Sequence, residues 1–406
     1  MKSLKILSYG DNPYVSTGYG QVWLNLLKRW TKLRPNWEFY HLGWQSRDRP
    51  HKTELGFIQL PMGKLEYGYD TVTSNLLRYK PDFLITLCDV GWQSGFIKGV
   101  FEAKKAGWRG KWIMYTPIDT HSWAMTWSEI FDKPDINVAM AEWGKKMMEL
   151  YQVPNVVMIP HGVDTKEFKP LNKEEIKTKL GLSGKFVVGF VGRNQRRKML
   201  VNLIRGFSTF AQGKDDVILA LHTDQEPAKA KQHNETPFVG WSLPYIQWKY
   251  KIADKLKLTK AGLDIDTRQR IQPENMNEIY NIMDVFCFAT GGEGFGLPAI
   301  ECQAAGVPLL MTACSTGFEL CKKENLIPVL KDKYGRMVVD IGTNGVEFVY
   351  PDDIAIAKLL DKFYDDWKKS GKLLKKESEE ARKFALKYDW DLIAPKWIEL
   401  FEENAR

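Results

Sequence analysis

The 406-residue sequence has little of what disulfide frameworks and metal sites require. Its five cysteines contain no Cys-x2-Cys pair, and its six histidines show no His-x3-His spacing. We therefore expect reduced, buried thiols rather than disulfide bonds, and no metal ion or other cofactor. The Asp-x-Asp sequence at Asp264 and Asp266 lies in a polar connector, which argues against a metal site there.

Long apolar runs are also absent. No stretch approaches the ~18 uninterrupted apolar residues that span a bilayer. The apolar part of Met1–Tyr9 is too short for a secretory signal and predicts a first strand, so we expect a cytoplasmic location. The formal charge of +8 favours anionic partners. One basic cluster leaves open a peripheral contact with an anionic membrane, although a solvated helix face is the simpler interpretation (Lys28, Arg29, Lys32 and Arg34).

Short apolar runs alternate with segments of helical periodicity along the whole sequence. This alternation predicts parallel sheets covered by helices on both faces. The first half has strand candidates at Leu4–Tyr9, Trp37–Leu42, Phe83–Leu87, Trp112–Tyr115, Ile136–Ala139 and Val156–Ile159. The pattern restarts with strands at Phe186–Val191, Val217–His222, Val285–Phe288 and Pro308–Thr312. The predicted fold is α/β, with two successive doubly wound, Rossmann-like domains.

The boundary between the two predicted domains falls in the connector Pro160–Gly184, which is charged and punctuated by Pro and Gly. We expect an N-terminal domain over residues 1–165 and a C-terminal domain over residues 166–388. Apolar residues at helical spacing within residues 389–406 predict a final helix. Such a helix needs a surface to cover, and we expect it to cross back to the first domain.

The strongest local signal is the glycine-rich segment Gly291–Glu301. It follows a buried strand and leads into a helix in which Pro298 is an early residue. Glycines allow a ligand to approach the backbone closely, and a helix start offers unpaired N–H groups to a diphosphate. Glu293 lies in the turn and Glu301 about a turn into the helix. Both carboxylates can therefore face one cleft, where one binds sugar hydroxyls and the other a ribose diol.

Two further segments agree with a phosphate-bearing ligand. Arg193 ends the segment Val188–Arg193, and Lys198 follows five residues later; a fork of donors plus a point charge suits a departing diphosphate. Arg196 and Arg197 are expected to be solvated. Near the N-terminus, a glycine-bearing loop over residues 12–20 joins the first strand to a helix. Loops of this kind allow the backbone to approach a phosphate group closely.

These segments, in the order in which they occur along the chain, resemble the glycine loop, the Gly-Arg…Lys motif and the Glu-x7-Glu motif of the retaining family-4 glycosyltransferases. The resemblance implies the GT-B fold, in which two Rossmann-like domains face a central cleft that binds a nucleotide sugar. It implies that Glu293 contacts the donor sugar, Glu301 the ribose, and Arg193 and Lys198 the diphosphate. Other donor-binding positions would be the turn residues Gly294, Phe295, Gly296 and Leu297, the N-terminal glycines Gly18 and Gly20, and Ile271 in a base-contacting loop.

The catalytic group of the first domain stays open. The family has a histidine after the fourth strand, where this sequence reads Tyr115–His121, so either Asp119 or His121 faces the cleft. Asp119 follows the strand end more directly and is preferred. Asp89 is an acceptor-side candidate. His161, in a segment that resembles the family's hinge motif, is expected to be structural.

The implied activity is transfer of a sugar from a UDP- or GDP-linked donor to an acceptor, with retention of configuration and without a metal ion. The acceptor is unidentified and could be a glycan, a lipid or a modified nucleic acid. A sugar-nucleotide 2-epimerase, a transferase acting on modified DNA and a non-catalytic sugar-nucleotide-binding protein remain alternatives.

Overall fold

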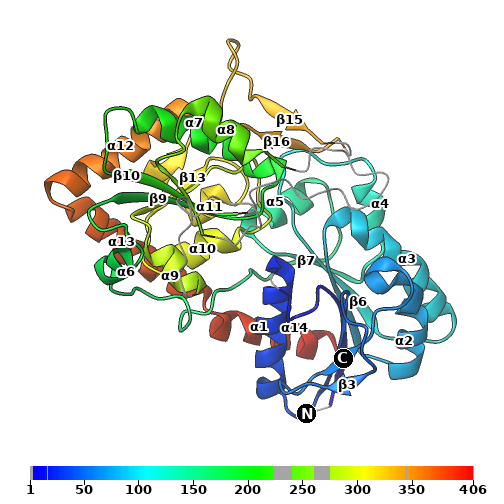
Figure 1. Ribbon diagram of the computed structural model, residues 1–406. Coiled ribbons are helices and arrows are strands. Elements are labelled where there is room, and N and C mark those ends of the chain that lie inside the picture. The colour runs from blue at the N-terminus through cyan, green and yellow to red at the C-terminus, as the bar shows by residue number, and fades with distance from the viewer. Residues whose placement is uncertain (1–2, 16, 224–239, 260–274, 343–344, 406) are drawn as a thin grey trace. The chain divides into compact units, whose positions relative to one another are not determined.

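A computed structural model describes residues 3–15, 17–223, 240–259, 275–342 and 345–405 (Figure 1). The chain forms two units. One contains Met1–Asp119, Trp123–Asp164 and Tyr388–Arg406, and the other contains Thr120–Ser122 and Thr165–Lys387. Apart from the short segment Thr120–Ser122, the polypeptide leaves the first unit after Asp164 and returns to it at Tyr388.

The first unit is built on an eight-stranded sheet with the order β3-β4-β2-β1-β5-β6-β7-β8. Neighbouring strands are parallel except β3 and β4. Every residue of the central strand β5 is buried, which requires cover on both faces of the sheet. The strands are β1 (Lys5–Gly10), β2 (Glu38–Gly43), β3 (His51–Lys52), β4 (Ile58–Leu60), β5 (Phe83–Leu87), β6 (Lys111–Thr116), β7 (Ile136–Ala139) and β8 (Val156–Met158).

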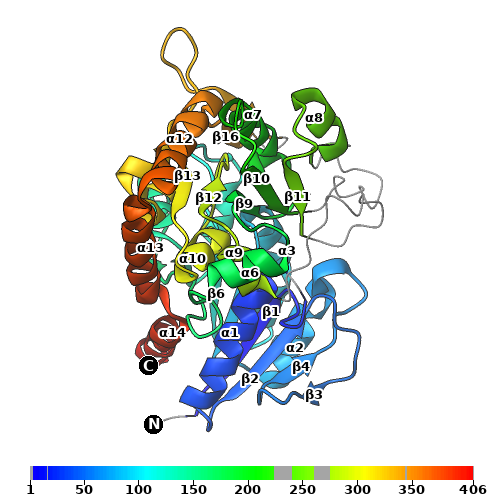
Figure 2. The same cartoon turned by 60° about the vertical axis from the view of Figure 1, so that its left-hand side comes forward.

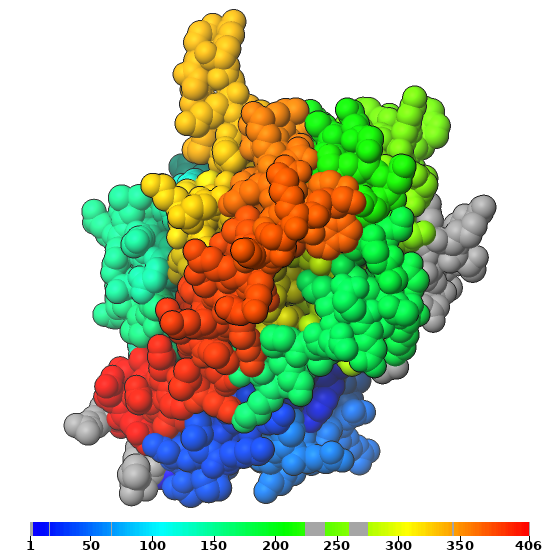
Figure 3. Space-filling model, turned by 90° about the vertical axis from the view of Figure 1, so that its left-hand side faces the viewer, coloured from blue at the N-terminus to red at the C-terminus, as the bar shows by residue number. Residues whose placement is uncertain are grey.

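Helices cover both faces of this sheet. They are α1 (Gly18–Leu33), the 3-10 helix η1 (Glu66–Thr71), α2 (Val72–Tyr79), α3 (Val90–Lys105), α4 (Trp127–Phe131), α5 (Glu142–Leu150) and α14 (Trp390–Asn404). The first and last helices lie side by side (Figure 3), and the buried ring of Trp30 on α1 meets Trp397 and Phe401 on α14. Side chains of β1 and β5 pack with Phe96 and Val100 of α3 and with α2.

The second unit is built on a six-stranded parallel sheet with the order β11-β10-β9-β12-β13-β14 (Figure 2). Counted from its first strand, β9, this order is 3-2-1-4-5-6, that of the dinucleotide-binding Rossmann fold. The strands are β9 (Phe186–Val191), β10 (Val217–His222), β11 (Leu256–Leu258), β12 (Val285–Phe288), β13 (Leu309–Thr312) and β14 (Leu326–Ile327). A separate antiparallel hairpin pairs β15 (Val339–Ile341) with β16 (Glu347–Val349).

The helices of the second unit begin with α6 (Lys173–Lys179), η2 (Arg196–Lys198), α7 (Leu200–Phe210), α8 (Leu243–Tyr250) and α9 (Met276–Asn281). They continue with α10 (Leu297–Ala304), α11 (Gly317–Leu320), η4 (Lys323–Asn325), α12 (Asp353–Lys369), α13 (Lys372–Ala385) and η5 (Leu386–Tyr388). Helices α12 and α13 form a continuous outer surface in Figure 3. The buried side chain of Ile356 on α12 lies against Gly206 of α7.

The α/β architecture with two Rossmann-like sheets is confirmed. The expectation for the thiols is confirmed as well, because all five cysteines are free and buried. Among the described residues, no helix is both long enough and apolar enough to cross a membrane.

The basic cluster of α1 does not form the continuous solvated face that the sequence suggested. The Arg29 side chain is buried and bonds to Asp391 at 2.6 Å and to Asp164 at 3.2 Å. Arg34 bonds to Glu402 at 2.7 Å. Two of the four cations therefore tie α1 to other parts of the first unit instead of facing a membrane.

Candidate active site

The predicted donor-binding residues of the second unit gather where its strand order reverses. Strands β9 and β12 are neighbours in the sheet although β10 and β11 intervene in the sequence. Their carboxyl ends form the crevice in which open α/β sheets bind ligands. Arg193 and Lys198 follow β9, and Glu293 follows β12. The sheet therefore brings two segments separated by about ninety residues to the same edge.

Glu293 is buried at this edge and is held by three donors. The Lys198 ammonium lies 2.6 Å from its Oε1, the Thr290 hydroxyl donates to the same oxygen at 2.8 Å, and Arg197 Nη1 lies 3.3 Å away. The backbone N–H of Glu293 donates to Ser315 Oγ at 2.9 Å. These contacts fix both the backbone and the carboxylate of the turn.

The charge state of Glu293 follows from these partners. Burial alone would raise the pKa of the carboxyl, but the positive charges of Lys198 and Arg197 outweigh that effect and lower it. Glu293 is only 4% exposed and Lys198 6%. Removing one member of such a buried pair typically costs about 3–5 kcal/mol, because the other charge is left without compensation. The ionised pair is thus a fixed part of the site.

Arg197 is a site residue that the sequence did not reveal, and its expected solvation is wrong. Its guanidinium donates to the carbonyl of Gly292 at 2.9 Å, and its own carbonyl accepts from Gly291 N–H at 2.7 Å. The 3-10 turn η2 causes this placement, because it points Arg197 and Lys198 toward the same glycine-rich turn. Arg196 is exposed as expected and pairs with Asp340 at 2.7 Å.

Arg193 differs from Lys198 in its surroundings. Its side chain is exposed, and within the described part of the chain it forms no hydrogen bond or ion pair. It directly follows Gly192 at the end of β9. The site therefore contains two cations that hold Glu293, Lys198 and Arg197, and one exposed cation at the strand end, Arg193.

The glycine turn leads directly into α10. Gly294, Phe295 and Gly296 are buried, and Leu297 begins the helix. Gly296 has φ +95°, a conformation that residues with a side chain rarely adopt. Pro298 occupies the first helical turn, as expected, and within the described chain no side chain caps the helix start. Backbone N–H groups at such a start are suited to bind an anion.

Glu301 lies one turn into α10 in an environment opposite to that of Glu293. Its Oε2 accepts a hydrogen bond from the Tyr280 hydroxyl at 2.6 Å. Burial raises the pKa of this carboxyl to about 7, and the charge of Glu167 contributes in the same direction. The two glutamates of the motif therefore differ in protonation near neutral pH.

In the first unit, the glycine-bearing loop is held by its own backbone and by a histidine. Thr17 caps α1 by accepting from Gly20 N–H at 3.0 Å, and it also donates to Asp11. Gly18 is exposed, whereas Gly20 is buried and a Cβ there would lie 2.7 Å from the Val15 carbonyl. Gly18 is thus accessible to a ligand, and Gly20 allows the loop to close on itself.

His41 supports this loop, and nothing in its sequence context indicates that role. Its Nε2 donates to the Asp11 carbonyl at 3.1 Å, and its Nδ1 lies 2.9 Å from Ser8 Oγ. Because a carbonyl can only accept, Nε2 carries the proton. Burial lowers the pKa of His41 to about 3, so the ring is neutral at physiological pH.

Asp119 and His121 both follow β6 and are both partly exposed. Asp119 belongs to the first unit and His121 to the second. Asp119 and Asp89 lie close enough to the Tyr19 hydroxyl that, together with burial, they raise its pKa. Burial lowers the pKa of His121, although the nearby Glu347 opposes this effect. The choice between Asp119 and His121 stays a prediction.

Comparison with known families shows to which family the chain belongs. A family model described as glycosyl transferases, group 1, matches residues 172–384, more than half of the chain. The chain belongs to this family of glycosyl transferases.

Curated relatives match over a shorter region. A lipopolysaccharide core biosynthesis mannosyltransferase, LpsB, from Rhizobium meliloti is 31% identical over 170 residues, which cover 41% of this chain and 43% of LpsB. A mannosylfructose-phosphate synthase from Agrobacterium fabrum is 25% identical over 180 residues, covering 44% of this chain and 35% of that protein. The matched region thus covers less than half the length of either relative.

Solved structures with the same fold match along nearly the whole chain. A glycosyltransferase from Rickettsia africae has a TM-score of 0.72 at 15% identity and is covered, like this chain, over 100% of its length. A sucrose-phosphate synthase from Thermosynechococcus elongatus has a TM-score of 0.71 at 16% identity, with 98% of each chain covered. HepE from Anabaena, solved with UDP and glucose, has a TM-score of 0.67 at 12% identity, with 98% of this chain and 100% of HepE covered. These similarities establish the GT-B fold.

The segment that resembles the family's hinge motif is part of the packing of the first unit. His161 is buried, as expected, and its ring lies 5.3 Å from that of Tyr115. Burial lowers the pKa of His161 to about 3. A Cβ on Gly162 would lie 2.7 Å from the Trp390 ring, so only glycine fits there.

Some predicted positions lie outside the described residues. They are the base-contacting loop with Ile271 and the Asp264–Asp266 pair. Within the residues that the structure does describe, there is no group of three or more His, Cys, Asp or Glu side chains that could hold a metal ion.

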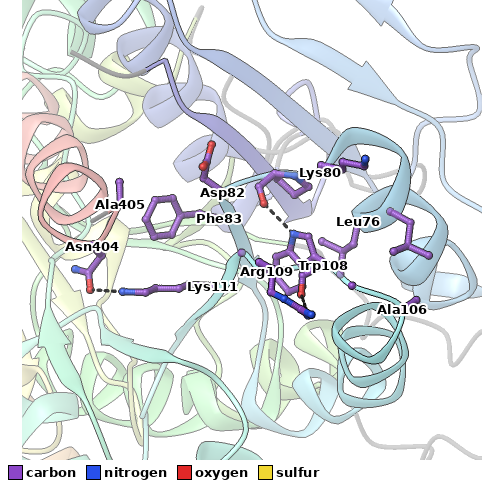
Figure 4. A pocket seen from close by; sticks show the side chains of 14 residues that line it. Leu76, Lys80, Asp82, Phe83, Ala106, Trp108, Arg109, Lys111, Asn404 and Ala405 are labelled. Atoms are coloured by element: carbon purple, nitrogen blue, oxygen red, sulfur yellow. Dashed lines mark hydrogen bonds between the residues drawn. The ribbon is translucent and has the colours of Figure 1, made fainter.

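A cavity of about 570 Å³ lies at the opposite, amino-terminal edge of the first sheet (Figure 4). Its basic side chains do not converge on one point. Lys111 donates to Asn404 at 3.3 Å, while Lys80 and Arg109 point away from Lys111 and from each other. In open α/β sheets, ligands bind at the carboxyl edge. The cavity therefore lies at the edge opposite to the one where this fold class binds its ligands.

Proposed function

We propose that this protein transfers a sugar from a UDP- or GDP-linked donor to an acceptor hydroxyl, with retention of configuration and without a divalent metal ion. The observation that carries the proposal is the cluster of Glu293, Lys198 and Arg197 at the switch point of the second sheet. It combines a fixed carboxylate for sugar hydroxyls with fixed positive charge for phosphates.

The proposed donor site uses the parts of this cluster in different ways. The exposed Arg193 guanidinium and the Lys198 ammonium would bind the diphosphate, together with the N–H groups at the start of α10. Glu293 would accept hydrogen bonds from donor sugar hydroxyls, and Glu301 would accept them from the ribose. HepE was solved with UDP and glucose, which supports a nucleoside diphosphate as the ligand class. Five free, buried thiols support a cytoplasmic location.

The proposed chemistry is dissociation of the bond between the anomeric carbon and the diphosphate, with attack from the same face. Negative charge grows on the departing diphosphate, and preorganised cations stabilise it most strongly at the transition state. Lys198 and Arg193 would supply that charge in place of a metal ion. Glu293 is bound tightly to Lys198 and Arg197, which argues against its use as a nucleophile.

A thermal-shift panel of nucleoside diphosphates and their sugars, with EDTA present, tests the donor site. We expect UDP or GDP and the matching sugar nucleotide to raise the melting temperature. Glu293→Ala should abolish transfer, because the contact with the donor sugar is lost. It should retain diphosphate binding, because Lys198 and Arg197, without the carboxylate of Glu293, remain available to the phosphates. Arg193→Ala should weaken both diphosphate binding and turnover.

Arg336→Ala is the matched control for Arg193→Ala, since it removes an exposed arginine of the same unit that pairs with Asp332. It should leave nucleotide binding and turnover unchanged. Nucleotide binding that requires Mg²⁺ would contradict the metal-independent site. Conversion of the donor to its 2-epimer without an acceptor would instead identify an epimerase.

A further inference from the structure

A group of aromatic rings at the carboxyl edge of the first sheet takes no part in the donor site. It consists of Trp44 just after β2, Tyr67 in η1 and Trp92 in the first turn of α3, and we call it the aromatic platform. The Tyr67 ring lies 4.6 Å from that of Trp44 and 4.5 Å from that of Trp92, measured between centroids. Trp44 is buried, but Trp92 is 46% exposed and Tyr67 is partly exposed. The platform is therefore anchored on one side and open to solvent on the other.

The backbone conformation of Tyr67 is unfavourable for a tyrosine, which suggests that the ring is retained to contact a ligand. Tyr67 has φ 64° and ψ 2°, a left-handed conformation that bulky residues avoid. The next residue, Gly68, has φ 70°, so the turn already uses one glycine. Strained residues of this kind gather at ligand sites, where the surrounding structure holds them in place. A tyrosine occupies a position where the backbone alone would favour a second glycine.

Asp89 stands beside the platform and does not act as a helix cap. It directly precedes α3, where an aspartate normally accepts from the first helical N–H groups. Within the described chain its carboxylate makes no such bond, and it accepts instead from the Tyr19 hydroxyl at 2.5 Å. The side chain is exposed, and the Asp89 carbonyl accepts from Trp92 N–H at 3.0 Å. An exposed carboxylate thus lies in the same turn as an exposed indole.

The space over this turn is open. Gly91 lies between Asp89 and Trp92 and is exposed, and a Cβ added to it would meet no atom within 4 Å. The turn belongs to the loop after β5, which neighbours β1 where the strand order of the first sheet reverses. Ligands bind at this position in open α/β sheets. The platform and Asp89 therefore border an accessible space at the expected ligand edge.

The side chains around this space match an uncharged sugar. The C–H face of a pyranose can lie on an aromatic ring, while its hydroxyls donate to a carboxylate. Asp119 also lies close enough to Tyr19 to contribute to its raised pKa, so a second negative charge lies near Asp89. The two negative charges disfavour a phosphate group on the acceptor, as in nucleic acids or anionic lipids.

We propose that Trp92, Tyr67 and Asp89 form the acceptor subsite and that the acceptor is an uncharged carbohydrate. Its ring stacks on Trp92, and one of its hydroxyls donates to Asp89. This proposal rests on the proposed function, because it identifies the molecule that receives the sugar.

Nucleotide release from UDP-glucose and GDP-mannose tests the acceptor class. Acceptors are methyl α-glucoside, methyl α-mannoside and maltose, compared with glucose 6-phosphate, duplex DNA and phosphatidylglycerol vesicles. We expect at least one of the three uncharged glycosides to accelerate release from the wild-type protein, and the charged compounds to have no effect. Acceleration by DNA or by vesicles alone would overturn the proposal.

Variants test the subsite itself. Trp92→Ala should raise the acceptor KM about tenfold, the factor that matches the loss of one stacking contact. Gly91→Trp should fill the open space and abolish transfer, while Tyr67→Gly should weaken acceptor binding. All three should keep the thermal shift with UDP or GDP. Trp248→Ala, which removes a tryptophan of the second unit that is 73% exposed, is the control.

The outcomes separate the two proposals. If UDP or GDP stabilises the protein but no glycoside is accepted, or if Trp92→Ala and Gly91→Trp leave the acceptor KM unchanged, the acceptor subsite is wrong. If no nucleoside diphosphate stabilises the wild-type protein, the donor assignment fails instead.

Discussion

Two glutamates of one motif, eight residues apart, lie in opposite electrostatic environments. Glu293 faces Lys198 and Arg197, and its pKa is lowered, whereas burial raises the pKa of Glu301 to about 7. Pairs of carboxyls whose surroundings separate their pKa values usually have different tasks. A permanently ionised Glu293 suits a constant contact with the donor sugar. Glu301 changes its charge within the physiological pH range.

The pKa of Glu301 predicts that nucleotide binding depends on pH. If only the ionised carboxylate accepts from both ribose hydroxyls, the affinity for UDP or GDP should rise about tenfold between pH 6 and pH 8. The sign follows because protonation below pH 7 removes the acceptor form. Isothermal titration calorimetry across this range provides the measurement.

Glu301→Gln is the control for this pH dependence, since the amide does not titrate. The ligand phosphates titrate as well, and their contribution remains in the variant. An equally steep pH profile in wild type and variant would show that Glu301 is not the titrating group.

The residue types that the sequence could identify are those whose role depends on local spacing. Glu293, Lys198 and Gly296 stand in motifs, and the structure places them at one edge. Arg197 and His41 could not be identified this way, because their contacts are with Glu293 and Asp11 in other segments. A side chain that acts across the fold gives no signal in its own neighbourhood.

At the scale of elements, β12, the glycine turn and α10 form one strand-turn-helix unit that aims N–H groups at the site. The turn depends on Gly296, which has φ +95°. A residue with a side chain would raise the conformational energy of the turn at this angle. No atom lies closer than 3.6 Å to a Cβ at this position, so the cost is conformational and not steric.

Gly296→Ala should therefore destabilise the protein by about 1–2 kcal/mol and weaken binding of UDP or GDP. Gly184→Ala is a matched control, because Gly184 has φ +67° and no neighbour within 4 Å of the added methyl. Chemical denaturation should give similar losses of stability for both variants. If both lose nucleotide affinity equally, the conformation of the α10 turn is not what binds the phosphates.

Within the described chain, every strand of four or more residues was predicted, because its apolar run is plain in the sequence, as for β9. The short strands β4, β11 and β14 were not predicted, since two or three residues carry no period. Helix α2 begins only at Val72, because the left-handed residues Tyr67 and Gly68 distort the turn that precedes it.

At the scale of the whole molecule, the first unit is assembled from both ends of the sequence. Helix α14 packs on α1 through Trp397, which is fully buried and whose ring also lies 4.9 Å from that of Tyr115. Ion pairs of Arg29 with Asp391 and of Arg34 with Glu402 link the same two helices. The stability of the first unit thus depends on α14.

Trp397→Ala should destabilise the first unit by about 3–5 kcal/mol, because it leaves a large cavity between the helix and the sheet. Leu392→Ala on the same helix, where the side chain is 56% exposed, should change stability by less than about 0.5 kcal/mol. Circular dichroism during urea denaturation measures both. Equal effects of the two variants would contradict the packing described for α14.

The assembly of the first unit from both ends of the sequence has a consequence during protein synthesis. The ribosome delivers α14 only after the whole of Thr165–Lys387, on the order of tens of seconds after the strands it covers. Through that interval the apolar face that will contact Trp397 and Phe401 stays uncovered, while the second unit can already fold. The nascent chain would thus complete the second unit, with the proposed donor site, before the first unit, and chaperones would bind mainly the first unit.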